Sequence, residues 1–222
     1  TFYTSAENMS QETLNLYYNR RHADEVSGTC SLVAMTMMAY TVKESKSYNL
    51  NKTKHQIFKE LKDAYLEVSG EQEYTGEQGK YFEDTIEKFY LKNGISVDVN
   101  FVKTSSNVNE SFCNDIEALS VLNIKGADVV YSGKSFAGWH SVLYVGCYAY
   151  KTIYKEQYLK IFKKDVEKFF LIYVVCDGWT NSNNGKIGSN YQLIVFNDTA
   201  SVEVTEIPMM LDNIIAEAFG DI

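Results

Sequence analysis

The chain has 222 residues, a formal net charge of −8 at neutral pH and a hydrophobic content of 45%. This length and apolar content suit one compact globular domain with a sizeable core. The acidic balance, with Arg20 and Arg21 as the arginines, argues against nucleic-acid binding, because a phosphate backbone needs clustered basic side chains. No apolar run approaches the roughly 20 residues that a membrane-spanning helix needs, so we expect no membrane-spanning segment.

The first half of the sequence has the apolar periodicity of helices. We expect helices over 10–20, 30–43, 51–68 and 78–93. The segment 30–43 is too densely apolar for a solvent-exposed stripe, which predicts a central helix buried on most sides. Asn93-Gly94 is a stop signal for the fourth of these helices.

The second half changes to the alternation and the β-branched and aromatic content of strands. We expect strands within 95–102, 127–133, 140–150, 169–176, 191–196 and 201–207, with one more helix over 110–122. Helices followed by antiparallel strands predict an α+β fold. We interpret the chain as one domain over 1–222, with a mainly helical lobe (1–94), a mainly β lobe (95–207) and a C-terminal tail (208–222).

The cysteines are far apart in the sequence, with no Cys-x-x-Cys pair and no histidine pair at zinc-ligand spacing. They are Cys30, Cys113, Cys147 and Cys176. We therefore expect no structural metal site, and nothing in the sequence points to a cofactor.

Cys30 has the position of a nucleophile. It follows Gly28-Thr29 and opens the predicted helix over 30–43. Unpaired N–H groups and the helix dipole favour a thiolate at a helix N-terminus, and the Cys30 N–H is a candidate donor to an oxyanion. The alternative is that Cys30 is a small buried hydrophobic residue.

A thiol nucleophile requires a base, and the sequence offers His22, His55 and His140. His22 and His55 lie in polar or lysine-rich stretches that are typical of a surface. His140 instead opens a predicted strand directly after a flexible loop, a frequent position for catalytic groups. His140 is therefore the candidate base.

The third group of such a site accepts a hydrogen bond from the imidazole. If the strands 140–148 and 170–177 are neighbours with His140 directly opposite Asp177, the two side chains share one face about 5 Å apart at Cβ. Asp177 is then the candidate orienting residue, and Asn181 is the alternative.

The same register makes a prediction about the cysteines of these strands. It sets Cys147 opposite Phe170, so Cys176 lies roughly 20 Å away along the ladder. A disulfide between Cys147 and Cys176 is therefore not expected.

Three motifs in order, "SGTCSLVAM", "GWHSVLYVGCYAY" and "VVCDGWTN", resemble those of papain-like cysteine peptidases. The sequence looks most like the bacterial branch with Asp in an Asp-Gly-Trp context. The resemblance implies a helical lobe whose central helix carries the cysteine, packed on an antiparallel sheet that carries the histidine and the acid. It also implies Cys30 as nucleophile, His140 as general base and then acid, Asp177 as orienting residue, and Trp179 as a shield against water.

The resemblance has one clear departure. The family often has a Gln about six residues before the nucleophile as an oxyanion donor, and this sequence has Asp24 there. An ionised carboxylate accepts hydrogen bonds and does not donate them. Asn19 and the hydroxyl of Ser27 are the alternative donors.

We therefore expect thiol-dependent hydrolysis of peptide or amide bonds through an acyl-enzyme on Cys30, with a peptide or protein as substrate. One alternative is a cell-wall amidase, transpeptidase or acyltransferase that uses the same thiol. Another is a papain-like binding module without activity. The resemblance and the start at Thr1 suggest a secreted or cell-surface bacterial protein whose targeting segment has been removed, with a cytoplasmic location as the alternative.

Overall fold

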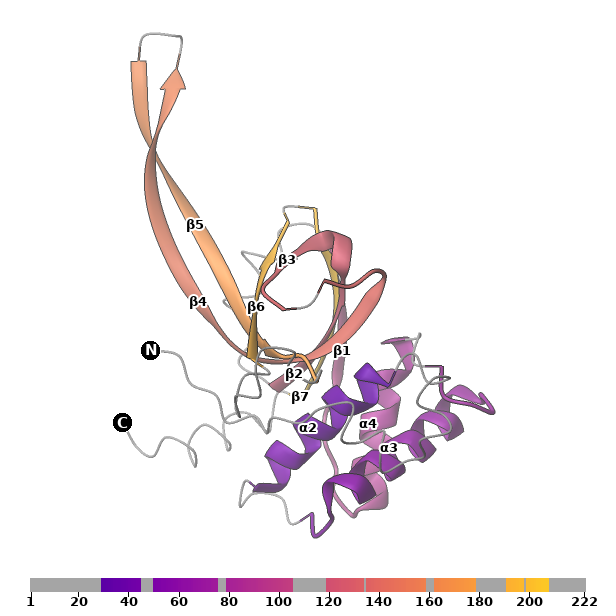
Figure 1. Ribbon diagram of the computed structural model, residues 1–222. Helices are drawn as coiled ribbons and strands as arrows, with labels where there is room; N and C mark the ends of the chain where they lie inside the picture. The colour runs from indigo at the N-terminus through magenta and orange to yellow at the C-terminus, as the bar shows by residue number, and fades with distance from the viewer. Residues whose placement is uncertain are drawn as a thin grey trace.

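The computed structural model describes residues 29–44, 50–75, 79–105, 119–133, 135–158, 162–178, 191–197 and 199–207. Within these ranges helices come first and antiparallel strands follow, which confirms the predicted α+β class. Figure 1 shows the helices gathered on one side of a curled sheet. The predicted helix over 10–20 and the tail 208–222 lie outside the described residues.

The helical part confirms the three predicted helices that fall within the described residues. Its elements are α2 (Cys30–Glu44), α3 (Lys54–Ser69), the short 3-10 helix η2 (Gly79–Tyr81) and α4 (Phe82–Lys92). Residues 31–39 of α2 are all buried, as expected for a central helix. This helix packs on α3 with one part of its surface and on the sheet strands β2 (Leu119–Lys125) and β4 (Trp139–Tyr158) with another.

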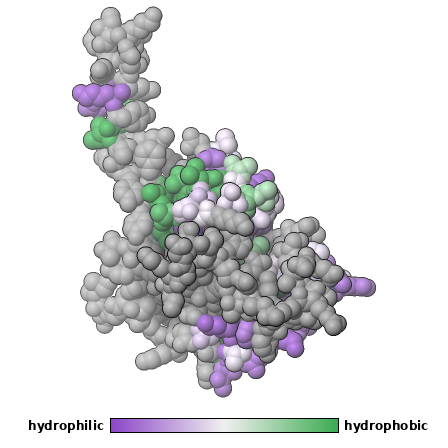
Figure 2. Space-filling model, in the orientation of Figure 1, coloured by the Kyte–Doolittle hydropathy of each residue, from purple (hydrophilic) through white to green (hydrophobic). Residues whose placement is uncertain are grey.

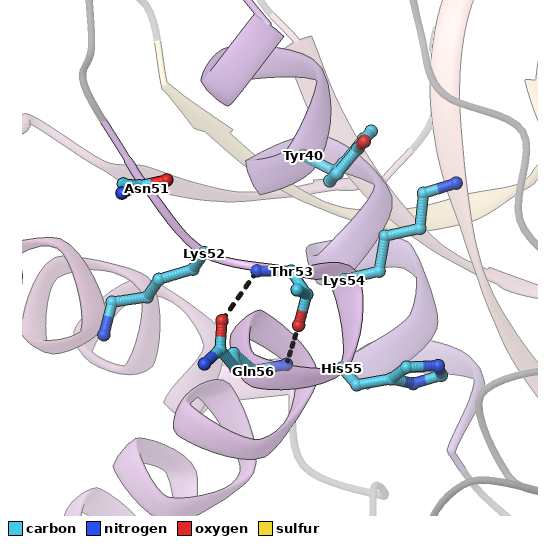
Figure 3. A pocket seen from close by; sticks show the side chains of 7 residues that line it. All are labelled: Tyr40, Asn51, Lys52, Thr53, Lys54, His55 and Gln56. Carbon is cyan, nitrogen blue, oxygen red and sulfur yellow. Dashed lines mark hydrogen bonds between the residues drawn. The ribbon is translucent and has the colours of Figure 1, made fainter.

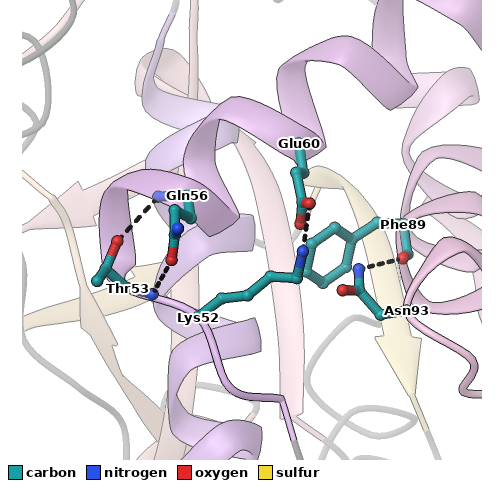
Figure 4. Close-up of polar contacts among 6 residues, drawn as sticks. All are labelled: Lys52, Thr53, Gln56, Glu60, Phe89 and Asn93. Carbon is teal, nitrogen blue, oxygen red and sulfur yellow. Dashed lines mark hydrogen bonds and ion pairs between the residues drawn. The ribbon is translucent and has the colours of Figure 1, made fainter.

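Local hydrogen bonds set the ends of α3, and Figure 4 shows those around its beginning. The Thr53 hydroxyl accepts from the Gln56 N–H at 3.3 Å, and the Gln56 side chain accepts from the Thr53 N–H at 2.8 Å. This reciprocal capping box satisfies donors that the first helical turn leaves unpaired. At the other end, Gly70 adopts a left-handed φ of 71° and stops the helix.

The strands form one antiparallel sheet in the order β1-β7-β2-β4-β5-β6-β3. The strands not yet introduced are β1 (Asn100–Ser105), β3 (Val129–Tyr131), β5 (Phe162–Cys176), β6 (Tyr191–Phe196) and β7 (Ser201–Ile207). The bounds of β6 and β7 are those that the sequence predicts.

The two faces of the sheet bury separate sets of side chains, because successive residues of a strand point to opposite sides. Val121, Leu143 and Cys176 join the core formed with the helices. The neighbouring residues Leu122 and Val142 join a second core, which lies on the face of the curled sheet away from α2. The central strands are therefore buried on both faces.

Strands β4 and β5 continue beyond the rest of the sheet as a long two-stranded arm (Figure 1). Their ladder runs from the pair Leu143–Cys176 to the pair Tyr158–Phe162, whereas β2 pairs with β4 over residues 139–144 and β6 pairs with β5 over residues 173–176. The sequence predicts shorter strands here and gives no sign of the arm.

Two predictions in the β part need correction. The strand expected over 95–102 begins at Asn100. The helix expected over 110–122 is wrong at its end, because residues 119–122 belong to β2, while 110–118 lie outside the described residues. A short apolar run buried on both faces does not distinguish a strand from a helix by periodicity, which explains the second error.

Figure 2 shows apolar side chains gathered on the surface where the arm meets the body of the protein. Val130 of β3 is 66% exposed and Leu193 of β6 is 43% exposed. These strands lie at the β3 end of the sheet order, so their outer surface is not covered by the helices.

Candidate functional site

Cys30 is the first residue of α2, where the sequence predicts it. The helix begins with a hydrogen bond from the Val33 N–H to the Thr29 carbonyl at 2.9 Å, so Thr29 is the residue that precedes the first turn. The N–H groups of the first turn have no partner within the helix. They are therefore available to the Cys30 sulfur.

The Cys30 thiol is partly exposed and carries no disulfide. Burial raises its pKa above the ordinary value for cysteine. Hydrogen bonding from the backbone of Ser141 and of Ser31, and from the Ser141 side chain, opposes this rise but does not outweigh it. The thiol is therefore protonated at neutral pH, and the helix N-terminus alone does not make it a thiolate.

His140 lies near the start of β4, opposite Ile124 of β2, and is 2% exposed. Its Nε2 lies 2.9 Å from the main-chain carbonyl oxygen of Asp177. A carbonyl oxygen only accepts, so Nε2 carries the proton and Nδ1 carries the lone pair when the ring is neutral. Burial lowers the pKa of His140 to about 3, although the bond to Asp177 opposes this. The neutral ring thus has the tautomer of a base.

Asp177 directly follows β5 and is 4% exposed. Its carbonyl holds His140, while its carboxylate oxygen Oδ2 accepts a hydrogen bond from the Tyr131 hydroxyl at 2.8 Å. Burial, together with the charge of Asp177, raises the pKa of Tyr131 well above its ordinary value, so this hydroxyl remains a donor. Asp177 therefore meets the imidazole through its main chain in this structure.

The predicted register between the two strands is wrong by two residues. Leu143 pairs with Cys176 and Tyr144 with Val175, so His140 and Asp177 are not directly opposite. A shift of two keeps both on the same face but places them diagonally, which lengthens the separation of their side chains. This offset accounts for contact with the carbonyl instead of the carboxylate.

The pairing of Cys147 also needs correction. Cys147 pairs with Tyr173, and Phe170 pairs with Tyr150. The ladder shifts at a bulge between Tyr144 and Gly146, and a constant register cannot be carried across a bulge. Cys176 is buried and forms no disulfide.

Ser141 and Gly178 join the two halves of the site. Ser141 follows His140 on β4 and points toward α2, where its hydrogen bonding lowers the pKa of Cys30. His140 points to the other face with its partner Ile124, in the core away from α2, so the structure does not bring the His140 ring together with the Cys30 thiol. Gly178 follows Asp177 with a φ of 69°, and a Cβ there would lie 2.8 Å from Cγ1 of Val33 in the first turns of α2. The ends of β4 and β5 therefore pack directly against the helix N-terminus that carries Cys30.

Sequence reasoning missed several side chains of this region. The Phe136 ring packs edge-on against His140 with centroids 5.3 Å apart, and Tyr131 packs edge-on against Phe136. On the other side, the buried hydroxyls of Ser31 and Tyr74 are hydrogen-bonded to each other. Burial raises the pKa of Tyr74 well above its ordinary value. Tyr74 lies in the loop between two predicted helices, and the sequence gives no other signal for it.

Most of the other residues named from the sequence lie outside the described residues. They are Trp179, Asn181, Asp24, Asn19, Ser27 and His22. His55 lies in the first turn of α3, beside a hollow of about 490 Å³ lined by Tyr40 and residues 51–56 (Figure 3). Tyr40 follows Cys30 by ten residues along α2, so this hollow lies about 15 Å along the helix from the thiol.

Within the described residues, no group of three or more His, Cys, Asp or Glu side chains is arranged to hold a metal ion. None of the helices in the described part of the chain is long and apolar enough to cross a membrane.

Comparison with protein-family models, curated proteins and solved structures finds no match to this chain.

Proposed function

We propose that the protein is a papain-like thiol hydrolase that cleaves peptide or amide bonds through an acyl-enzyme on Cys30. His140 acts as the general base and then as the general acid, and Asp177 orients it. The observation that carries this proposal is the hydrogen bond from His140 Nε2 to the Asp177 carbonyl, at the residue that precedes Ser141, whose hydrogen bonding acts on the pKa of Cys30. That bond leaves Nδ1 with a lone pair, the form that a base requires.

The protonation states favour proton transfer during attack over a thiolate–imidazolium pair formed in advance. The pKa of Cys30 is raised and that of His140 is lowered, so both groups are neutral at neutral pH. As sulfur attacks the carbonyl carbon, the thiol proton passes to His140 Nδ1, which later returns it to the leaving amine. Because His140 lies on the face of β4 away from α2, this transfer requires a rearrangement that brings the sulfur and Nδ1 to hydrogen-bonding distance, directly or through one water.

The developing oxyanion needs a donor in this mechanism. The Cys30 N–H stands at the first helical position, where no helical carbonyl competes for it. We assign it as one donor. A second donor from Asn19 or Ser27 remains part of the proposal, because both lie outside the described residues.

Hydrolysis of a mixed peptide library by wild-type protein and by Cys30→Ala tests the proposal. We expect Cys30→Ala to lower the rate by at least about 10³-fold, because the covalent step is lost. Cys176→Ala is the matched control, since Cys176 also forms no disulfide but is fully buried. Equal cleavage by wild type and Cys30→Ala would refute the proposal.

A second candidate is a papain-like binding module without catalysis, and the neutral states of Cys30 and His140 favour it. A protein of this kind cleaves no library peptide, and its Cys30 reacts with iodoacetamide no faster than an ordinary thiol of raised pKa. Adding an amine nucleophile to the cleavage assay separates hydrolysis from acyl transfer, because a transferase forms the new amide.

A further inference from the structure

An apolar strip lies on the surface of the sheet where the arm meets the body (Figure 2). We define the strip as Val130 of β3, Leu193 and Val195 of β6, and Ile172 of β5. Val130 and Leu193 are exposed, and the other two are partly exposed. Apolar side chains gathered in this way on a surface are typical of an interaction site.

The pairing of the strands puts the whole strip on one face of the sheet. Val130 pairs directly with Val195, and Leu193 pairs directly with Val174 of β5. Ile172 is two residues from Val174 and therefore points to the same side. The residues on either side of Ile172 in β5 belong to the core on the opposite face.

The same face continues along the arm. Val166 is partly exposed and is an even number of residues from Ile172. Tyr154 pairs with Val166 and Tyr150 pairs with Phe170, so these positions share the face of the strip. Within the described residues, β4 beyond residue 144 pairs with β5 alone, and β5 before residue 173 pairs with β4 alone. The arm is thus a ribbon two strands wide with an apolar face.

A ribbon of this kind needs a further layer on its apolar face, because two strands alone are marginally stable in water. β5 has 15 residues, so the arm is roughly 50 Å long and 10 Å wide. Its face and the strip together cover roughly 600 Å² as a flat area, and the accessible area of the side chains is larger. Stable complexes bury about 800 Å² on each partner. The surface therefore has the size of a protein interface.

The distribution of charge indicates which protein covers it. The segment 146–174 has six lysines and three acidic residues, a net charge of +3. The whole chain has a net charge of −8, so the rest of the chain carries −11. The arm is thus complementary in charge to the body of another copy of the same chain.

We propose that the strip and the apolar face of the arm form the interface of a homodimer with a two-fold axis. In a two-fold pair, both copies contribute the same surface. The two arms run in opposite directions, so the basic outer half of each arm lies beside the acidic body of the other copy. This inference concerns assembly and does not depend on the proposed catalytic function.

The first test is the mass of the full chain in solution by sedimentation equilibrium. We expect twice the chain mass of 25.3 kDa at about 100 µM, since interfaces of standard size dissociate at micromolar concentrations or below. A mass of 25.3 kDa at that concentration would overturn the proposal.

Val130→Lys tests the strip. It puts an ammonium group into the apolar contact of both copies, so we expect the dissociation constant to rise at least about tenfold. Val102→Lys is the matched control, because Val102 is also an exposed valine but lies on β1, at the opposite end of the sheet order. Equal dimerisation of the two variants would exclude the strip from the interface.

Lys164→Gln tests the arm. Lys164 is an exposed residue on the same face as Val166. At low ionic strength, its loss from both copies should raise the dissociation constant about threefold. Lys59→Gln is the control, because Lys59 is an exposed lysine of α3, away from the arm (Figure 1). Equal constants for these two variants would contradict the placement of the arm against an acidic body.

A lipid surface is the other occupant that a basic apolar arm suits. Sedimentation with vesicles of phosphatidylcholine and phosphatidylglycerol distinguishes the two. A monomer that sediments with these vesicles would assign the arm to lipid and overturn the dimer. Neither measurement requires turnover, so the outcome is separate from that of the peptide-cleavage assay.

Discussion

Cys30 and His140 lie on opposite faces of β4 and have different surroundings, because Ser141 points toward α2 and the preceding His140 points away from it. The thiol lies on the helix-facing side, among the hydroxyls of Ser31, Tyr74 and Ser141. The imidazole packs against Phe136, and its Nε2 donates a hydrogen bond to the main-chain carbonyl of Asp177. Hydroxyls can reverse direction, whereas a carbonyl can only accept. The thiol environment is therefore adjustable and the imidazole environment is fixed.

The largest expected effect on stability comes from disrupting the packing of Gly178 against α2, where the two regions meet. Gly178→Ala introduces a Cβ at φ 69° and 2.8 Å from Val33, and we expect a loss of about 2–4 kcal/mol in the free energy of unfolding. Gly70→Ala is the matched control, because Gly70 has φ 71° with no atom within 4 Å of the new Cβ. It should lose about 1–2 kcal/mol. Urea unfolding of both variants measures the difference, and equal losses would show that the packing at Gly178 is unimportant.

The fixed imidazole predicts a pH dependence of stability. The pKa of His140 is lowered to about 3 when folded, from 6.5, so the unfolded state binds more protons between these values. Its contribution is complete above pH 6.5 and is lost as the pH falls toward 3. At pH 4.5 we expect a loss of about 2–3 kcal/mol relative to pH 7.5. Urea unfolding of His140→Gln should show a loss smaller by this amount, and an identical pH dependence would contradict the burial of a neutral ring.

Tyr131→Phe tests how firmly the imidazole side is held. It removes the donor to the buried Asp177 carboxylate, which should lower the free energy of unfolding by about 1.5–3 kcal/mol. Because Tyr131 does not contact the thiol side, the midpoint of Cys30 alkylation should stay constant. A loss below about 0.5 kcal/mol would mean that the carboxylate does not depend on this hydroxyl.

The smallest effect separates stability from the site. Thr53→Ala removes the capping box of α3 and should lower the free energy of unfolding by about 1 kcal/mol. The alkylation profile of Cys30 should not change. A shifted profile would show that general loss of stability, and not the local hydrogen bonds, controls the thiol.

Local sequence signals predicted much of this fold. The dense apolar run of α2, the spacing in α3 and α4, and the alternation in β6 and β7 each determine an element without help from distant residues. They failed at β2, where burial on both faces removes the alternation. They also failed at the arm, since strand length depends on pairing with a distant strand.

The candidate site could be predicted as a set of residues but not as a set of contacts. Cys30 at the helix start, His140 in β4 and Asp177 after β5 are positions that motifs reveal. The use of the Asp177 carbonyl depends on a two-residue register offset. The hydrogen bonds from Ser141 to Asn123 and from Asn123 to Glu203 require three strands to be aligned together. Sequence spacing contains no information on such alignment.

The most direct test of the account is the rate of peptide cleavage at pH 7.5 by wild-type protein and by His140→Gln. Both groups are neutral in the folded protein, so attack of the thiol on a peptide carbonyl depends on proton transfer to His140 in the proposed mechanism. The account predicts cleavage at least about 100-fold slower in His140→Gln. Equal rates in the two proteins would contradict the assignment of His140 as the base for Cys30.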